Sequence, residues 1–412
     1  MNSVNPVLSK ERFIILDALR GLALLGICLA NYPEFSLYTF QSTETINSMQ
    51  TARIDKTVRY LQYFFIDGKF YTIFSLLFGV GFSIILSNAQ RKNASGFRIF
   101  YRRMFVLALI GFLHLMFIWS GDILLLYALL GMLLPLFLEL SDKKLLWLSA
   151  GFIVFPVVVD TLVVIGGINL SEAAIRWQQY YCGLYGITDD NFGIWLRDAN
   201  SYGDVFCFLI QGAFVRLQEF IDGHRALKVM GLFVLGYYIG RNRLYANLED
   251  RKTWLAKVCR IGFLVGIPTS FLYAWSGTNG HPAGIVFHSL LYTVSIVPMG
   301  LAYVAGLSLL YIRHRESGIW KLLAAPGRMA LTNYIGQSFI GMLLFYGIGF
   351  GLGASIGLVT TEVIAAGVFL FQIVFSIFWL RFCQFGLLEW IWRMLVYNKR
   401  LNLLKKETIN RS

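Results

Sequence analysis

Apolar segments close to membrane-spanning length recur along the whole chain, separated by shorter polar stretches. A helix needs about 20 apolar residues to cross a hydrocarbon core about 30 Å thick. The pattern predicts an all-α polytopic membrane protein, with residues 1–412 forming a single transmembrane domain of about ten transmembrane helices. The predicted spans, with boundaries uncertain by a few residues, are 13–32, 69–88, 104–120, 123–140, 145–166, 226–240, 259–276, 284–312, 328–350 and 358–380.

Basic residues are distributed unequally between the two sides of these predicted spans. Lys and Arg are frequent after the second, sixth and eighth spans and in residues 381–412, whereas 277–283 and 351–357 contain neither. Lys and Arg accumulate in cytoplasmic loops, so both termini are predicted to be cytoplasmic. The same rule makes 381–412 a basic cytoplasmic tail and makes 33–68 and 167–225 extracytoplasmic segments.

Composition agrees with a membrane protein and narrows the range of partners. The chain is 57% hydrophobic and 14% charged, whereas soluble domains have roughly 25% charged residues. Its formal net charge of +13 is explained by cytoplasmic loops that meet anionic lipid. The lipid bilayer is therefore the predicted partner, and nucleic acid is not. The five cysteines are scattered without a metal-binding spacing, and no metal site is predicted.

The first predicted span contains an acid, a base and an amide. A charge at mid-membrane costs about 2.5–3.5 kcal/mol on insertion scales, so such residues need partners or a water-filled cavity. Asp17 and Arg20 are three positions apart, and Asn31 lies fourteen positions after Asp17, which leaves about 40° between them around a helix. The three residues and Gly21 are therefore predicted to share a face that is turned into the bundle. This face either lines a site or holds an ion pair that ties helices together.

A second group of polar residues lies toward the predicted outer side. His114 lies within the third predicted span, and Asp122, Lys69 and Asn31 lie at outer ends of spans. A histidine beside a carboxylate can act as a general base near neutral pH. The alternative is a buried structural histidine.

A third group opens the ninth predicted span, in the stretch APGRMALTNYIGQS at 325–338. Arg328 lies at its cytoplasmic entrance, and Asn333 lies one turn further along. These residues are candidates for binding a ligand. The alternative for Asn333 is hydrogen bonding between helices, which is common for amides in membrane proteins.

Five stretches together resemble the YeiB-like bacterial inner-membrane proteins. They are LDALRGLALLGICLAN, GKFYTIFSLLFGVG, GFLHLMFIWSGDILLLYALLG, GRMALTNYIGQS and FGLLEWIWR. Where a GPxEW-type pattern is expected, the chain has Gly386, Leu387, Leu388, Glu389 and Trp390, without the proline. The resemblance implies a multi-pass protein of the bacterial cytoplasmic (inner) membrane.

The YeiB-like proteins are grouped with the transmembrane acyltransferases. In one branch of that group, an acetyl group passes from cytoplasmic acetyl-CoA to a sugar amine across the membrane. The first helix of that branch is similar to the stretch that contains Asp17, Arg20, Gly21, Asn31 and Tyr32. That branch also has a histidine shortly after the asparagine, whereas residues 33–68 contain none. The resemblance therefore implies either that His114 takes the base role or that acetyl chemistry is not retained.

The resulting hypothesis is a membrane-embedded acyltransferase that moves an acyl group from cytoplasmic acyl-CoA, such as acetyl-CoA, to an unknown extracytoplasmic acceptor. His114, oriented by Asp122, is the predicted base, and Asn31 is the predicted oxyanion donor. The predicted substrate- and cofactor-binding residues are Asp17, Arg20, Gly21, Lys69, Arg102, Arg103, Arg328 and Asn333.

Two alternatives use the same residues differently. The first is a transporter or permease, in which the intramembrane charges form a path for a small solute or a proton. The second is a structural subunit of a larger complex, and a homo-oligomer is compatible with any of these roles.

Overall fold

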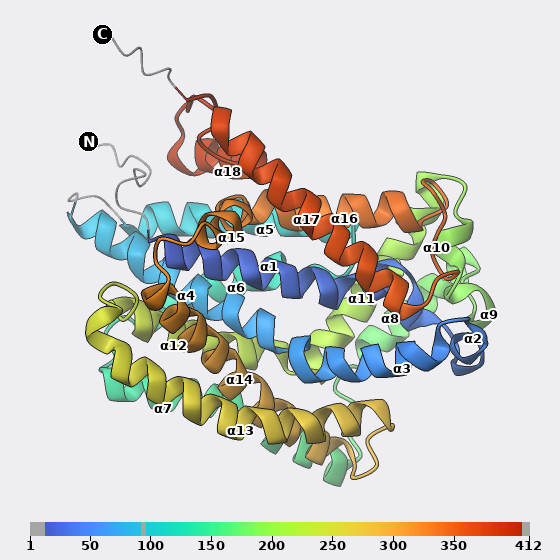
Figure 1. Ribbon diagram of the computed structural model, residues 1–412. Coiled ribbons are helices and arrows are strands. Elements are labelled where there is room, and N and C mark those ends of the chain that lie inside the picture. Colours follow the sequence, from blue (N-terminus) through green and yellow to red (C-terminus); the bar gives the residue numbers. More distant parts are fainter. Residues whose placement is uncertain (1–12, 92–95, 406–412) are drawn as a thin grey trace.

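The computed structural model describes residues 13–91 and 96–405 and shows a bundle of helices (Figure 1). Within these residues, helices are the regular elements, apart from an isolated β-bridge between Cys383 and Leu404. The all-α prediction is therefore confirmed.

Seven helical stretches in the described ranges are long and apolar enough to cross a membrane. They correspond to seven of the predicted spans, and the prediction of a membrane protein is confirmed. They are α1 (Ile14–Phe35), the stretch Ala52–Asn88, α5 (Gly96–Phe117), α7 (Asp142–Gly166), the stretch Glu249–Thr278, which contains α13 (Lys252–Thr278), α14 (Ile285–Arg313) and α17 (Leu358–Phe382).

The other three predicted spans are helical but shorter. The fourth is divided into α6 (Leu124–Gly131) and η4 (Leu134–Phe137), which contains a proline. The sixth is α12 (Arg225–Arg241) with 17 residues, and the ninth is α16 (Ala330–Phe345) with 16 residues. The count of ten spans therefore stays a prediction.

Both predicted extracytoplasmic segments are largely helical. The first holds η2 (Tyr38–Phe40), α2 (Thr43–Ser48), α3 (Ala52–Leu61) and η3 (Gln62–Ile66), and the second holds α8 (Glu172–Tyr185), α9 (Asp189–Phe192), α10 (Trp195–Asp198) and α11 (Tyr202–Asp222). A capping box formed by Ser201 and Asp204 fixes the start of α11. Helices α2 and α8–α11 gather at one end of the bundle (Figure 1).

A broken helix runs through the middle of the bundle. Helix α4 (Lys69–Arg91) continues the direction begun by α3 and η3, but Gly68 interrupts the helix with a φ of +74°. Phe70 packs against Gly26, near the midpoint of α1, and Gly68 packs against Ile296 in α14. The sequence predicts a span that begins at residue 69, whereas helical structure begins at Ala52 and the break lies about halfway along α1.

Helix α1 also packs closely against α15 (Ile319–Arg328) through two glycines. A Cβ added at Gly21 would lie 1.9 Å from the Leu323 carbonyl oxygen, and one added at Gly327 would lie 1.9 Å from the Asp17 carbonyl oxygen. Such distances leave no room for a side chain. Gly21 therefore sets the distance between the two helix backbones.

We expect Gly21→Ala to lower the unfolding temperature of the purified protein, because overpacking typically costs about 1–3 kcal/mol. A matched control is Gly151→Ala in the middle of α7, where an added Cβ meets nothing within 4 Å. Thermal unfolding in detergent, followed by tryptophan fluorescence, measures both. Equal unfolding temperatures for the two variants would contradict the proposed packing role of Gly21.

Candidate functional site

A cavity of about 740 Å³ follows one face of α1 along the bundle. Asp17 and Arg20 line it near one end of the helix, and Asn31 and Glu34 line it near the other. Asp17 and Glu34 are separated by about 25 Å at 1.5 Å per residue. The prediction that Asp17, Arg20 and Asn31 share one face turned into the bundle is confirmed.

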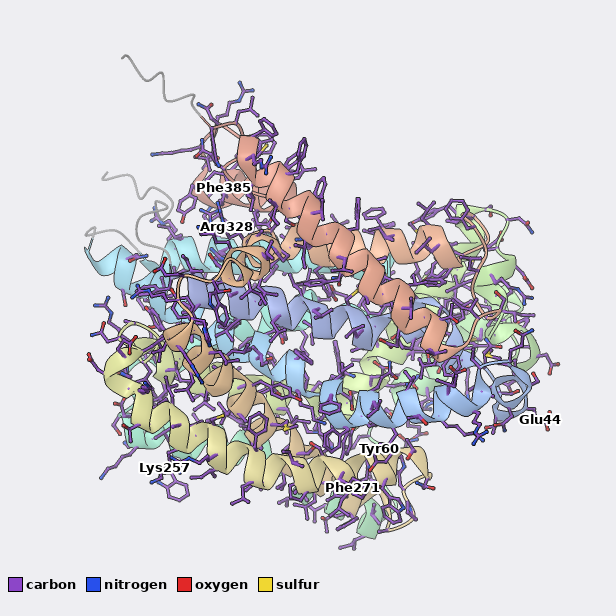
Figure 2. All side chains as sticks on the ribbon, viewed as in Figure 1. Glu44, Tyr60, Lys257, Phe271, Arg328 and Phe385 are labelled. Carbon is purple, nitrogen blue, oxygen red and sulfur yellow. The ribbon has the colours of Figure 1, made fainter. Side chains whose placement is uncertain are left out.

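Arginines gather in the cavity wall at the end where α1 begins, which we call the arginine end. They are Arg20, Arg103, Arg243, Arg328 and Arg393. Arg20 Nη1 donates to Asp17 Oδ1 at 2.7 Å, and the Arg103 guanidinium lies 4.1 Å from the centre of the Trp392 ring. Figure 2 places Arg328 toward this end of the bundle and Glu44 toward the opposite end. The arginine end thus concentrates donors suited to phosphate or carboxylate.

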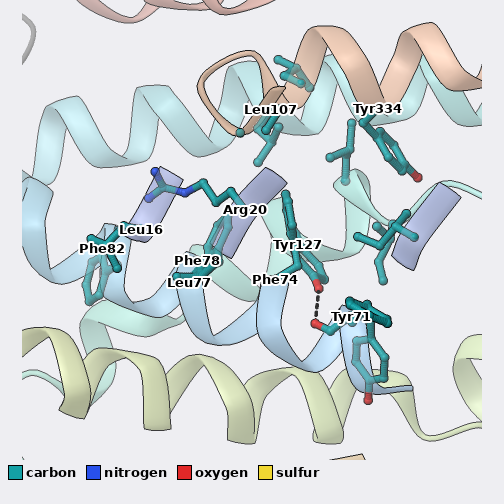
Figure 3. Close-up of a pocket in the computed structure, with 18 of the residues that line it drawn as sticks. Leu16, Arg20, Tyr71, Phe74, Leu77, Phe78, Phe82, Leu107, Tyr127 and Tyr334 are labelled. Atoms are coloured by element: carbon teal, nitrogen blue, oxygen red, sulfur yellow. Dashed lines mark hydrogen bonds between the residues drawn. The ribbon is translucent and has the colours of Figure 1, made fainter. Parts of the chain in front are cut away.

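The middle of the cavity is mainly apolar and aromatic. Its wall includes Phe74, Leu77, Phe78 and Leu107, drawn around the pocket in Figure 3. Tyr127 also lies here, and its hydroxyl is hydrogen-bonded to Ser75. This section offers few charged partners and suits a thin, weakly polar chain.

Charged residues from four parts of the chain meet at the other end of the cavity, and we call them the outer cluster. It contains Glu34 from α1, Asp67 from the helix break, Arg216 and Glu219 from α11, and Arg225 from α12. Arg216 is paired with Glu219, and its Nη2 lies 3.9 Å from Glu34 Oε2. The Tyr273 hydroxyl donates to Asp67. The cavity therefore joins arginines at one end to a mixed, carboxylate-rich cluster at the other.

The predicted His114–Asp122 pair is present but lies outside the cavity wall. His114 Nδ1 is 2.9 Å from Asp122 Oδ1, and His114 Nε2 is 2.9 Å from Ser338 Oγ. The other Asp122 oxygen accepts a hydrogen bond from the Leu125 backbone N–H. Tyr334 lines the cavity, and its ring lies 5.3 Å from the His114 ring. This buried network links α5, α6 and α16, and no local pattern around Ser338 indicates that this residue takes part.

Four other predicted residues also lie outside the wall. Lys69 is fully buried and donates from Nζ to the Tyr63 carbonyl oxygen at 2.6 Å. Asn333 donates to Ser376 Oγ at 3.0 Å and so connects α16 to α17. Arg102 is exposed, and Gly21 faces α15. Of the predicted site residues, the structure therefore brings Asp17, Arg20, Asn31, Arg103 and Arg328 together along the cavity.

Glu389 belongs to the quoted FGLLEWIWR stretch and was not predicted as a site residue. It lies in α18 (Leu387–Tyr397), lines the arginine end and accepts hydrogen bonds from the Leu331 N–H at 2.7 Å and the Thr332 N–H at 3.2 Å. Those N–H groups belong to the first turn of α16, which has no intrahelical acceptor for them. Burial raises the pKa of the Glu389 carboxyl. Glu389 therefore anchors the start of α16 beside the cavity.

We expect Glu389→Ala to lower the unfolding temperature, because each buried donor left unpaired costs about 1–3 kcal/mol. Glu389→Gln keeps one acceptor oxygen, and we expect it to lose less. Fluorescence-detected unfolding of both variants checks this order. An unfolding temperature for Glu389→Ala equal to that of the unaltered protein would show that the cap is dispensable.

Comparisons with known proteins show which proteins the chain resembles. A family model described as "Protein of unknown function (DUF418)" matches residues 239–399. The uncharacterized protein YxaH of Bacillus subtilis (strain 168) is 27% identical, and the match covers 99% of this chain and all of that protein. The uncharacterized protein YeiB of Escherichia coli (strain K12) is also 27% identical, with 93% of this chain and 96% of that protein covered. These matches identify the chain as similar to YeiB-like proteins over nearly its whole length.

A further YeiB-like relative is described as an uncharacterized 39.9 kDa protein in the amylase 3' region of Bacillus acidopullulyticus. It is 29% identical, and the match covers 98% of this chain and 99% of the relative. No solved structure matches the chain. None of these three relatives is described by an activity, so a functional proposal depends on the site itself.

Proposed function

We propose that this YeiB-like protein transfers an acyl group from cytoplasmic acyl-CoA to an acceptor at the extracytoplasmic face of the bacterial inner membrane. The observation that supports it is the cavity that joins the arginine end to the outer cluster. Phe13, near the N-terminus, and Arg393, in the basic C-terminal tail, line the cavity at the arginine end. The positive-inside rule favours a cytoplasmic location for both termini and therefore for the arginine end.

The arginine end suits the phosphates of coenzyme A. Guanidinium groups bind phosphate through paired, charge-assisted hydrogen bonds. With the phosphates among Arg20, Arg103 and Arg328, the pantetheine arm would follow the apolar middle section. The thioester would then approach Asn31 and Glu34 at the outer cluster.

The outer cluster suits transfer of the acyl group. The acceptor oxygen or nitrogen attacks the thioester carbonyl carbon, and the Asn31 amide donates to the developing oxyanion. Glu34, one turn beyond Asn31, accepts the acceptor's proton. The C–S bond then breaks, and the coenzyme A thiolate leaves and takes up that proton. His114, predicted from the sequence as the base, lies next to Tyr334 and outside the cavity wall, and it is the alternative proton acceptor.

Acetyl-CoA binding and turnover test the proposal. We expect purified protein in nanodiscs to bind acetyl-CoA in isothermal titration and to release free coenzyme A slowly in the absence of an acceptor. CoA-free acetate is the control ligand and should not bind. Failure to bind or cleave acetyl-CoA and longer-chain acyl-CoA esters would refute the proposal.

The broken helix favours transport as a second candidate function. Discontinuous helices near the membrane midplane are frequent in secondary transporters, where they build the solute site. Here the break at Gly68 lies beside Asp67 in the cavity wall. Uptake of a solute into proteoliposomes that requires Asp17 and Arg20 and yields no covalent product would favour transport. Transfer of the acyl group to an acceptor without solute flux would exclude it.

A further inference from the structure

A smaller cavity of about 370 Å³, which we call the vestibule, adjoins the outer cluster. Its wall comes from α1, α3, η3, α9, α11 and the loops beside them. It shares Glu34, Asp67 and Glu219 with the main cavity. These three carboxylates therefore stand between the two cavities. The volume lies at the lower end of the range for small-molecule sites, about 300–1,000 Å³.

Two hydrogen-bond donors in the vestibule wall have spare capacity. Gln211 is fully buried, and its Nε2 has no hydrogen-bond acceptor in the described part of the chain. Arg59 donates to Gln62 Oε1 at 3.4 Å and stacks on Tyr63, but it forms no ion pair with any described residue. A buried donor left unpaired is costly and calls for an explanation. A ligand with an anionic or carbonyl oxygen supplies the missing acceptor.

An aromatic surface completes the vestibule. The ring of Phe192 lies 5.4 Å from that of Phe40 and 5.1 Å from that of Phe208. These three rings form an apolar part of the vestibule wall. The vestibule thus combines donors, acceptors and an apolar face within one small volume.

We infer that the vestibule binds the acyl acceptor, a small molecule that carries an anionic group and a hydroxyl or amine. The anionic group would meet Arg59 and Gln211, and the hydroxyl or amine would donate to the shared carboxylates. That orientation directs the nucleophilic atom toward the main cavity, where the proposed transfer takes place. The binding site stands on the vestibule geometry alone, whereas its role as the acceptor site rests on the proposed function.

Glycerol 3-phosphate is a suitable probe because it carries a phosphate and two hydroxyls. We expect radiolabelled glycerol 3-phosphate to bind the full-length protein in phosphatidylcholine nanodiscs, measured by equilibrium dialysis. Arg59→Gln and Gln211→Leu should each weaken binding at least tenfold, and Arg59→Lys should weaken it less. Glycerol, which lacks the anion, should not compete.

The matched control is Arg53→Gln, an exposed arginine on the same helix α3 that is absent from the vestibule wall. Equal binding by Arg59→Gln and Arg53→Gln would overturn the inference, as would no binding at millimolar probe. The anionic ligand could be a lipid headgroup or a soluble molecule, and nanodiscs of phosphatidylglycerol distinguish the two. Weaker probe binding in these nanodiscs assigns the vestibule to a lipid headgroup. Unchanged probe binding assigns it to a soluble molecule.

Acetyl-CoA binding on the same samples separates the two proposals. If acetyl-CoA binds and the probe does not, the vestibule inference fails and the donor proposal stands. If the probe binds and acetyl-CoA does not, the vestibule is a ligand site and acyl transfer fails.

Discussion

We expect Glu34→Gln to lower the rate of acyl transfer by at least about 100-fold while acetyl-CoA binding changes little. The reason is that a positioned base contributes typically 10²–10⁴-fold, whereas Glu34 lies about 21 Å along α1 from Arg20 in the proposed phosphate site. Release of coenzyme A from acetyl-CoA, with glycerol 3-phosphate as the acceptor, measures the rate. Isothermal titration of acetyl-CoA measures binding on the same sample.

Two further variants show whether the lower rate of Glu34→Gln results from removal of the base. Glu44→Gln, in exposed α2, changes a similar charge outside both cavities and should keep the full rate. His114→Ala removes the other proton acceptor. If His114→Ala abolishes the rate without lowering the unfolding temperature and Glu34→Gln does not, His114 is the base and the assignment to Glu34 is wrong.

We expect Arg103→Gln to weaken acetyl-CoA binding by roughly 10- to 100-fold. A hydrogen bond to a charged group contributes about 1.5–3 kcal/mol, and each 1.4 kcal/mol is tenfold in affinity. Arg103 lies in the cavity wall and is held against Trp392, so its guanidinium is preorganised. Titration with acetyl-CoA, and with dephospho-coenzyme A as a ligand with fewer charges, measures the change.

The neighbouring residue provides the control for this prediction. Arg102 adjoins Arg103 in sequence but is exposed and outside the wall, where its Nη2 lies 3.3 Å from the Leu395 carbonyl oxygen. Arg102→Gln should therefore bind acetyl-CoA like the unaltered protein. Equal losses in the two variants would indicate general attraction by a basic surface instead of a site in the cavity.

The first helix was the most predictable part of the site. Its spacing alone placed Asp17, Arg20 and Asn31 on one face, because helical geometry is local and a costly polar residue in an apolar segment must be turned inward. Gly21 is also turned into the bundle, but it meets α15, whose Leu323 is more than 300 positions away in the chain, and not the cavity. Spacing identifies a face but does not identify what covers it.

The outer cluster was not predictable in the same way. Arg216 and Glu219 lie in a segment whose charges resemble those of an ordinary extracytoplasmic stretch, and only the tertiary packing of α11 brings them to Glu34. A weak local signal was present, since both are charged residues that lie among apolar residues in the second half of α11. The pairing itself depends on long-range contacts that one sequence does not encode in its local pattern.

His114 illustrates a partly predicted interaction. Asp122 was identified as its partner because both residues flank one turn, and the 2.9 Å contact agrees with that. Ser338 is 224 residues away from His114 and occupies the other ring nitrogen. A histidine whose two ring nitrogens both contact buried partners is held in one orientation. The position of His114 in the sequence did not reveal this second contact.

The break at Gly68 separates residues that line the vestibule from residues that line the main cavity. Arg59 and Gln62, before it, line the vestibule, and Phe74 and Phe78, after it, line the main cavity. Because Gly68 interrupts the backbone hydrogen-bond ladder, a twist of α3 is not passed on to α4 as it would be through an unbroken rod. Asp67, directly before the break, lines both cavities, which therefore meet where the two helical segments are joined.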